Sequence, residues 1–401
     1  MRRAVHLAAL AGLLGAAQSQ QVTLRSVAGE QIAGARGAVA DERIEVTRSD
    51  GSSVALLLDE VESVTCPGGR SLAKAGPGKV WLRSGAVFGA QMVGADGSTA
   101  RFELGFDAPV PLGLVHLRAL RFEAESAAPA DSGFAEAVAE PPQTTDLLFA
   151  WNRNSGKLTR LSVRVLAFEE GRLRVDYRGE RTVPLDQIHG LVFGVDHGVV
   201  PVAPPAPSVR VHLASDGPTL VARWVRAEGG VATFALAEGP EVRLGFDQID
   251  RIDVRSSRVL RLDALVPDTV EQTPAFDVVR PFLVGEAPGG TGLRLGNRAF
   301  SRGLCLFPRA RLSWNIDARS FDVFETTIGI DARSTGPADA VFRILLDDTV
   351  LVERKHVTLG SVETLRVPLG AGNQLTLEVD FGASYDLGDH CVFADPRLLK
   401  L

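Results

Sequence analysis

Short segments in which apolar and polar residues alternate run through most of the chain. Arg43 to Val46 and Arg172 to Tyr177 are examples, and such a period of two places successive side chains on opposite sides of a half-buried strand. Turn-forming residues separate the segments, with 41 glycines and 22 prolines in 401 residues. Beyond the first 20 residues no long stretch keeps a helical period. The sequence therefore predicts a mainly β protein.

One pattern recurs four times before the last third of the chain. Each unit opens with a short alternating strand, at Val22, Val80, Leu147 and Val209. Each closes with a strand, a short polar kink and another strand, at 56–64, 111–120, 183–192 and 244–253. Units of this size suit small curled β-barrels of the SH3-like or Sm-like kind, each standing alone or sharing a core with another.

Composition suggests where the units are separated. Residues 124–145 are rich in Ala, Glu, Pro and Ser, and residues 201–208 are rich in proline, so both stretches are expected to be linkers. The predicted organisation is two β units in 20–123, the first linker, a third unit in 146–200, the second linker, a fourth unit in 209–257, and a terminal domain in 258–401.

The beginning of the chain resembles an export signal. Arg2 and Arg3 precede an apolar run from Ala4 to Ala17, and small residues follow at the positions that a signal peptidase reads. We expect a signal peptide in residues 1–19, cleavage near Ser19 and Gln20, and a secreted or periplasmic protein. The run is too short for a bilayer span, so no transmembrane anchor is expected after cleavage.

Charge and motifs exclude several function classes. The net charge is −6 and the basic residues are scattered, so nucleic acid is not expected as a partner. Neither His-Glu-x-x-His nor Gly-x-Ser-x-Gly occurs, and the seven histidines lack the spacing of zinc ligands. Three cysteines are too few for a metal cluster. The chain is therefore not expected to be an enzyme.

Alternation becomes clearer in the last third. Leu312, Trp314 and Ile316 share one side of their segment, and 375–381 alternates in the same way, which predicts two sheets packed face to face. Asp347 and Asp348 lie between two apolar strands and predict a hairpin turn, because aspartate tolerates turn conformations.

Three landmarks of this region resemble a known family. They are Gly303-Leu304-Cys305-Leu306-Phe307, Ile328-Gly329-Ile330-Asp331, and Asp389-His390-Cys391-Val392-Phe393-Ala394-Asp395. In their order and spacing they resemble the NPCBM family of carbohydrate-binding modules, over about 258–401. The resemblance implies a galactose-binding-like β-sandwich with jelly-roll topology that binds a polysaccharide or a glycoprotein glycan.

The chain departs from the family pattern at three of these positions. Family members usually carry His where this chain has Phe307, Asp where it has Val392, and Trp where it has Phe393. The polar residues that remain as candidate ligand contacts on connecting loops are Asp331, Arg333, Tyr385, Asp386, Asp389, His390 and Asp395. A structural hydrogen bond is the competing explanation for His390, and solvated turns are the competing explanation for the aspartates. Asp386 and Asp389 could also hold a structural calcium ion.

Two cysteines belong to the outermost landmarks. Cys305 and Cys391 lie in what would be the first and last core strands of the sandwich, which could be neighbours, so a disulfide between them is one hypothesis and two buried free thiols the other.

Three functions remain open. The first is an exported, non-catalytic protein whose terminal sandwich binds a glycan, with the upstream units as spacers or partner-binding modules. The second is an assembly protein of the cell envelope that binds other exported proteins and has lost sugar binding. The third is an accessory to a glycoside hydrolase on another chain.

Overall fold

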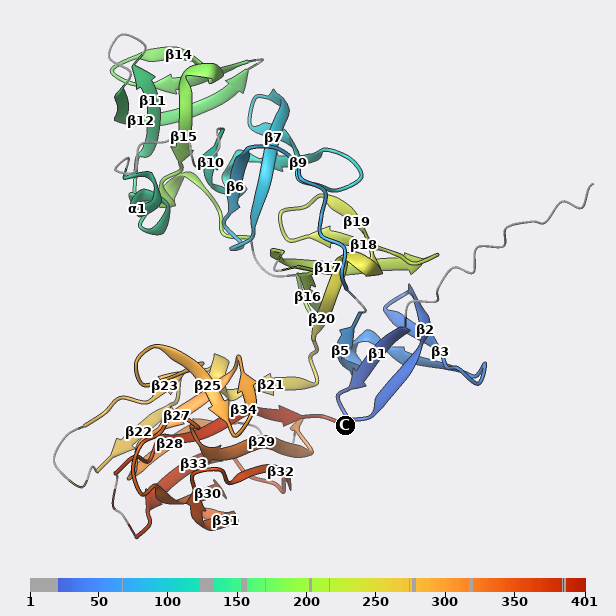
Figure 1. Cartoon of the computed structure of the whole chain (residues 1–401), viewed down its shortest axis with the longest axis vertical. Coiled ribbons are helices and arrows are strands. Elements are labelled where there is room, and N and C mark those ends of the chain that lie inside the picture. The colour runs from blue at the N-terminus through green and yellow to red at the C-terminus, as the bar shows by residue number, and fades with distance from the viewer. Residues whose placement is uncertain are drawn as a thin grey trace, which may run out of the picture.

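The computed structural model describes residues 21–66, 68–122, 133–152, 157–169, 171–201, 204–215, 217–273, 275, 279–316, 320–383, 385 and 387–401. Strands dominate it, as predicted, and they form two ten-stranded sheets upstream and a sandwich at the C-terminal end. Figure 1 shows four small barrels in a curved row, with the sandwich placed against one end of the row. The expected fold class is confirmed.

Each barrel is a unit of five strands with the same internal order. The strand sequence β4-β3-β2-β1-β5 of unit 1 recurs in every unit, and a 3-10 helix joins the fourth strand to the fifth. The four polar kinks expected from the sequence are these 3-10 helices. The bounds in unit 1 are β1 Gln21–Ser26, β2 Gln31–Ala40, β3 Arg43–Thr47, β4 Ser53–Leu57, η1 Leu58–Glu60 and β5 Val61–Thr65. Those in unit 2 are β6 Gly78–Leu82, β7 Val87–Asp96, β8 Thr99–Glu103, β9 Val110–Gly113, η2 Leu114–His116 and β10 Leu117–Arg121.

Units 3 and 4 repeat this arrangement. The bounds in unit 3 are β11 Asp146–Asn152, β12 Lys157–Glu169, β13 Arg172–Asp176, β14 Glu180–Pro184, η4 Leu185–Gln187 and β15 Ile188–Val192, followed by η5 Val195–His197. Those in unit 4 are β16 Ser208–Leu213, β17 Thr219–Glu228, β18 Val231–Leu236, β19 Glu241–Gly245, η6 Phe246–Gln248 and β20 Ile249–Arg255.

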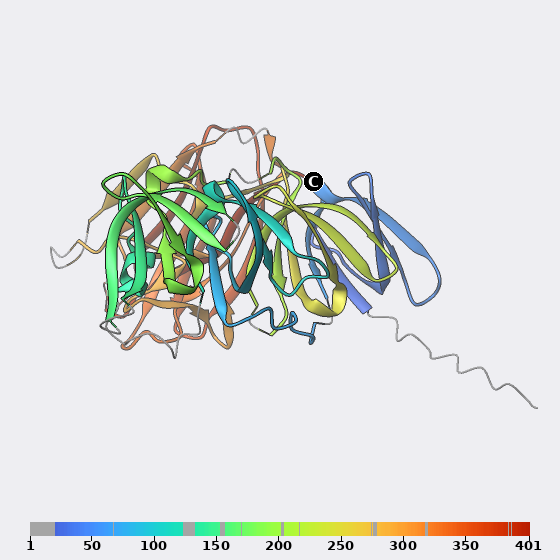
Figure 2. The same ribbon diagram turned by 90° about the horizontal axis from the view of Figure 1, so that it is seen from above.

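The units pair in a nested order rather than along the sequence. Unit 1 joins unit 4 because β5 pairs antiparallel with β20, and unit 2 joins unit 3 because β10 pairs antiparallel with β15. In both views the barrels follow one another in the spatial order 3, 2, 4, 1 (Figures 1 and 2). Units 2 and 4 are therefore neighbours in the middle of the row, and buried residues of all four units form one continuous apolar cluster.

One short helix covers a sheet face outside the barrels. The stretch expected to be a linker, 124–145, contains α1, Phe134–Ala139, so that expectation is wrong for this part of it. Phe134 and Ala137 are buried against Phe149 on β11 and Val192 on β15. The spacing of Phe134, Ala137 and Val138 gives even this short segment an apolar side to bury.

The terminal domain is a two-sheet sandwich. One sheet has the order β23-β27-β34-β29-β32 with β21 also beside β34, and the other has the order β22-β28-β33-β30-β31. The bounds of these elements are β21 Val259–Arg261, η7 Leu262–Ala264, β22 Thr269–Gln272, β23 Leu283–Val284, β27 Gly303–Leu306, β28 Ala310–Asn315, β29 Val323–Ile330, β30 Asp339–Leu346, β31 Thr349–Thr358, β32 Val362–Pro368, β33 Gln374–Phe381 and β34 Cys391–Leu399. A small third sheet consists of β24 Glu286–Ala287, β25 Thr291–Leu295 and β26 Arg298–Phe300.

Alternating residues fill the core between the two large sheets. Leu312 and Trp314 on β28 are buried with Leu375 and Leu377 on β33, as the period of two predicts. The hairpin expected at Asp347 and Asp348 connects β30 to β31, and both residues have the positive φ angles of a turn, 47° and 61°.

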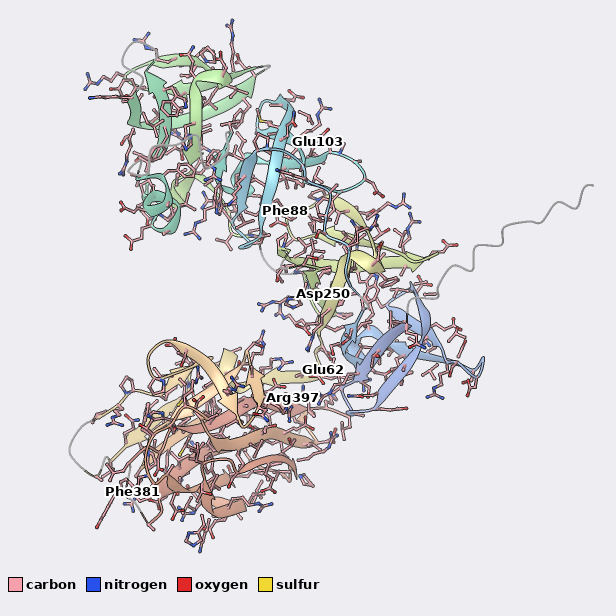
Figure 3. All side chains as sticks on the ribbon, viewed as in Figure 1. Glu62, Phe88, Glu103, Asp250, Phe381 and Arg397 are labelled. Carbon is pink, nitrogen blue, oxygen red and sulfur yellow. The ribbon has the colours of Figure 1, made fainter. Side chains whose placement is uncertain are left out.

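A buried network of charges joins the sandwich to unit 1. The side chain of Arg397 on β34 is 2% exposed and contacts Glu62 of unit 1 and Glu325 on β29, the latter at 2.5 Å. Arg25 of unit 1 binds Glu62 at 3.0 Å. Apolar contacts among Val27, Val323 and Leu399 continue the junction. The labels in Figure 3 place Glu62 and Arg397 next to each other where the barrels meet the sandwich.

Candidate functional site

Asp331 fixes the loops at one end of the sandwich. It follows β29 directly, is 1% exposed, and accepts hydrogen bonds from the backbone N–H groups of Arg294 at 2.9 Å and Arg333 at 3.0 Å. Burial would raise the pKa of Asp331, but these hydrogen bonds and the guanidinium of Arg333 outweigh it and lower the pKa. Asp331 is therefore an ionised anchor, with both carboxylate oxygens engaged.

Arg333 presents a fixed but accessible cation beside this anchor. Its Nε lies 3.0 Å from Asp331 Oδ1, and its guanidinium also donates to the carbonyl oxygen of Gly292. The side chain is nevertheless 41% exposed. An oriented guanidinium with free edges suits hydrogen bonding to ligand oxygens.

His390 lies next to this pair. Its carbonyl oxygen accepts the N–H of Asp331 at 2.9 Å, and its ring stands edge-on to Phe307 at 5.8 Å between centroids. Arg280 lies over the ring of Phe307 at 5.7 Å. Burial lowers the pKa of His390, against the opposing effect of Asp331, so the imidazole is neutral at pH 7 and can both donate and accept hydrogen bonds.

The connection between β33 and β34 carries an exposed tyrosine. Tyr385 is 61% exposed, and its ring lies 6.4 Å from that of Phe381. Asp389 is buried and accepts the N–H of Asp339 at 2.9 Å, and Asp339 in turn accepts the N–H of Ala383 at 2.9 Å. The two aspartates therefore brace the connection that presents Tyr385.

Most of the predicted site residues meet at this end of the sandwich, in different roles. Asp331, Arg333 and His390 are in contact, whereas Asp389 is a buried brace below Tyr385. Asp386 lies outside the described residues. Arg280 and Arg294 were not among the predicted site residues, because neither belongs to a landmark motif. We call Asp331, Arg333, His390, Phe307 and Tyr385 the loop site.

Asp395 is the one predicted residue that the structure places elsewhere. It contacts Arg261, and it lies 3.2 Å from Arg397 in the junction with unit 1. Since a strand rises about 3.3 Å per residue, the first four residues of β34 carry the chain roughly 13 Å away from the loop site. Asp395 therefore lies apart from the other predicted residues and contacts two arginines of the junction.

The three departures from the family pattern differ in their structural meaning. Val392 and Phe393 are fully buried, and the Phe393 ring packs edge-on against Phe342 at 5.2 Å. They are therefore core residues, and their replacement changes packing rather than a ligand surface. Phe307 is also buried, in the apolar cluster that contains Val392, but its ring stands beside His390 at the loop site.

The proposed disulfide is contradicted by the strand register. β27 and β34 are neighbours, as expected, but Cys305 is opposite Val392, and Leu306 is opposite Cys391. Neighbouring positions on a strand face opposite sides of the sheet, so the two thiols belong to different apolar clusters, and both are free. Cys66 is also a buried free thiol.

These three thiols are expected to be unreactive in the folded protein. Burial raises the pKa of Cys66 and Cys305 to about 12 and that of Cys391 well above its ordinary value, so almost no thiolate exists at pH 7. A thiol reagent should detect none in the native protein and all three after unfolding without reductant. Recovery of a single thiol after unfolding would mean that two are bonded.

Two further observations concern possible metal ligands and possible membrane-spanning helices. No group of three or more His, Cys, Asp or Glu side chains within the described ranges is placed to hold a metal ion. Asp389, one of the two residues considered for calcium, bonds the backbone of Asp339 through Oδ1. No helix in the described part of the chain combines the length and apolarity needed to cross a bilayer.

Comparison with known proteins gives a family for the sandwich, and the solved structures named next share little sequence identity with the chain. A CBM51 module of a Clostridium perfringens GH95 protein, solved with methyl-galactose, is 19% identical with a TM-score of 0.32, covering 35% of this chain and 99% of that one. Tandem CBM51 modules of a Streptococcus pneumoniae family 98 glycoside hydrolase are 10% identical with a TM-score of 0.33, covering 95% and 88%. No curated protein matches the chain. The model of the NPCBM/NEW2 domain matches residues 260–399, so the resemblance inferred from the three landmarks is confirmed for the terminal sandwich.

Proposed function

We propose that the protein is an exported, non-catalytic glycan-binding protein whose loop site contacts the sugar. The NPCBM/NEW2 match over 260–399 is the observation that carries the proposal, because it covers the domain that displays the loop site. Sugar binding needs oriented polar groups and an accessible ring. Arg333 and His390 offer the polar groups, and Tyr385, on the connection between β33 and β34, offers the ring. The barrels then serve as spacers or as modules that contact partners.

Catalysis is not part of this proposal. The loop site has one buried carboxylate, Asp331, whose oxygens are already occupied by Arg294 and Arg333. Glycoside cleavage requires two carboxylates that can face each other across a bond. The second carboxylate nearby, Asp389, is occupied by the N–H of Asp339 at 2.9 Å.

One observation favours a second candidate function. Phe307 puts an apolar ring where family members usually carry His, and it covers one side of His390. A sandwich that no longer binds sugar would then act through protein contacts, as an assembly protein of the cell envelope. An accessory role beside a hydrolase on another chain requires the loop site to bind sugar, so it is a variant of the first candidate.

Replacing Tyr385 by alanine tests the loop site directly. The full chain is applied to a glycan array containing terminal galactose, N-acetylhexosamine and uronate residues, and the affinity for the best ligand is measured by calorimetry. We expect Tyr385→Ala to weaken binding roughly tenfold, because an aromatic contact at a binding site is worth about 1.4 kcal/mol. The exposed ring contributes little to folding, so stability should stay unchanged.

The chain offers a matched control. Its only other tyrosine, Tyr177, is 37% exposed beside the hairpin turn of unit 3, and Tyr177→Ala should leave affinity unchanged. Binding to no glycan on the array, together with a stable complex with another exported protein, would favour the assembly function.

A further inference from the structure

The outer face of unit 4 gathers cationic side chains from three neighbouring strands. On β16 and β20, Val209 and Val211 pair with Val254 and Ile252, and these four point into the barrel. The alternate positions therefore point outward. They hold Arg210 and His212 on β16, Arg251, Asp253 and Arg255 on β20, and Thr219, Val221 and Arg223 on the adjoining half of β17. We call this set the arginine face.

Most of the charge on the arginine face is unneutralised. The side chains of Arg210, Arg223 and Arg255 are exposed and make no hydrogen bond or ion pair with any described residue. Asp253 is the single acid among the positions named above. It is already bound by His212 at 2.9 Å and by Arg251 at 2.5 Å. The whole chain carries a net charge of −6, so the charge of the arginine face has the opposite sign to that of the molecule.

The equivalent face of the other ten-stranded sheet is built differently. There the outward positions of β11 and β15 hold Leu147, Phe149 and Val192, and helix α1 covers them through Phe134. In unit 4 the corresponding positions hold Arg210, His212 and Asp253. One sheet thus buries an apolar face under its own helix, whereas the other leaves a polar, cationic face in solvent.

Hydroxyl groups lie beside the arginines. The hydroxyl of Thr219 lies 3.2 Å from His212 Nδ1, so a continuous hydrogen-bonded row crosses from β17 to β20. β5 adds the exposed Thr65 opposite Arg251, whereas Ser63, opposite Asp253, is buried. Neighbouring strands lie about 4.8 Å apart, so these groups form a shallow strip of donors and acceptors over several strands. In Figure 3, nitrogen-tipped side chains near the labelled Asp250 project toward the sandwich.

We propose that the arginine face binds an anionic polysaccharide, through its carboxylate or sulfate groups. Guanidinium groups match these oxyanions in charge and in the geometry of paired hydrogen bonds, and the row from Thr219 to Asp253 can bond sugar hydroxyls. The outward positions include no aromatic residue on which a nucleic-acid base could stack, and Val221 is their only apolar side chain, too little for a lipid surface. The inference goes beyond the proposed function, because it gives the barrels a ligand of their own.

The test uses the full chain with two probes, polygalacturonate and a sulfated galactan, and neutral methyl-esterified pectin for comparison. The variant combines Arg210→Gln, Arg223→Gln and Arg255→Gln. Its control combines Arg43→Gln, Arg172→Gln and Arg181→Gln, which are exposed arginines on other barrel surfaces and give the same change in charge. Affinity is measured by calorimetry at two salt concentrations, and folding by thermal melting.

We expect binding to at least one anionic probe and none to neutral pectin. The first triple variant should lose about tenfold in affinity, since each exposed charge contact contributes a few tenths of a kcal/mol to 1 kcal/mol, while the control loses less than twofold. Higher salt should weaken binding. Tyr385→Ala should leave this interaction unchanged, which separates it from sugar binding at the loop site.

Three results would overturn the proposal. The first is no binding to either anionic probe by a folded chain. The second is an equal loss in the two triple variants, which would mean that only net charge matters. The third is tighter binding of duplex DNA or of anionic vesicles that the first triple variant abolishes, which would assign the arginine face to another class of ligand.

Discussion

Replacing Arg397 by alanine is expected to destabilise the folded chain by roughly 3–5 kcal/mol, because two buried carboxylates lose the only partner that is buried with them. Arg397 is 2% exposed and contacts Glu62 of unit 1 and Glu325 of the sandwich. Arg25, Arg261 and Arg366 would still contact these glutamates, but all three are partly exposed and none fills the volume of the lost guanidinium. Denaturant unfolding followed by tryptophan fluorescence measures the change.

Arg366→Ala is the matched control for this prediction. Arg366 binds the same Glu325 at 3.0 Å, but its side chain is 37% exposed, so its loss should cost no more than about 1 kcal/mol. The sandwich transition should also separate from the barrel transition in Arg397→Ala if the junction couples the two. Equal, small effects of both substitutions would show that the buried network adds nothing to stability.

The second large effect is expected at Phe393. Its ring is fully buried between the sheets and packs edge-on against Phe342 at 5.2 Å. Phe393→Ala should cost about 3–5 kcal/mol, from lost burial and from the cavity left behind. Phe393→Trp, which introduces the residue usual in the family, should cost roughly 1–3 kcal/mol because this core is packed around the smaller ring.

Phe300→Ala is the control for the loss of stability expected of Phe393→Ala. Phe300 is the last residue of β26 in the small third sheet and is only partly buried, so Phe300→Ala should cost about 1 kcal/mol or less. Thermal melting of the three variants ranks the effects. Tolerance of alanine at 393 would contradict the assignment of this position to the core and would reopen its role as a ligand contact.

Local features of the fold could be read from the sequence, and their order in space could not. The four polar kinks became the 3-10 helices η1, η2, η4 and η6, and Asp347 and Asp348 form the expected hairpin turn. The nested pairing of units was not predictable, because every unit ends on a similar strand and many pairings satisfy the same alternation. Helix α1 was missed because its apolar side consists of few residues in a stretch with the composition of a linker.

The sequence predicted some residues of the candidate site, but it could not predict which side chains contact one another. Landmark motifs identified Asp331 and His390, which lie in contact. Asp395 belongs to the same motif, but its role depends on Arg261 and Arg397, and on a junction with a unit more than 300 residues earlier. The hypothesis of a disulfide between Cys305 and Cys391 was wrong because the register of β27 and β34 differs by one residue from the one it needs. Cys305 is opposite Val392 rather than Cys391. Motifs therefore located the loops but not the partners of each side chain.

The nested pairing has a consequence for synthesis on the ribosome. β5 ends at Thr65 and its partner β20 begins at Ile249, so unit 1 emerges long before the strand that continues its sheet. At about 5–20 residues per second, its edge would wait roughly 10 to 40 s. During that interval the free edge of β5 could pair with another nascent chain. Rapid completion of unit 4, or a chaperone that shields this edge, would decide the yield of correctly folded protein.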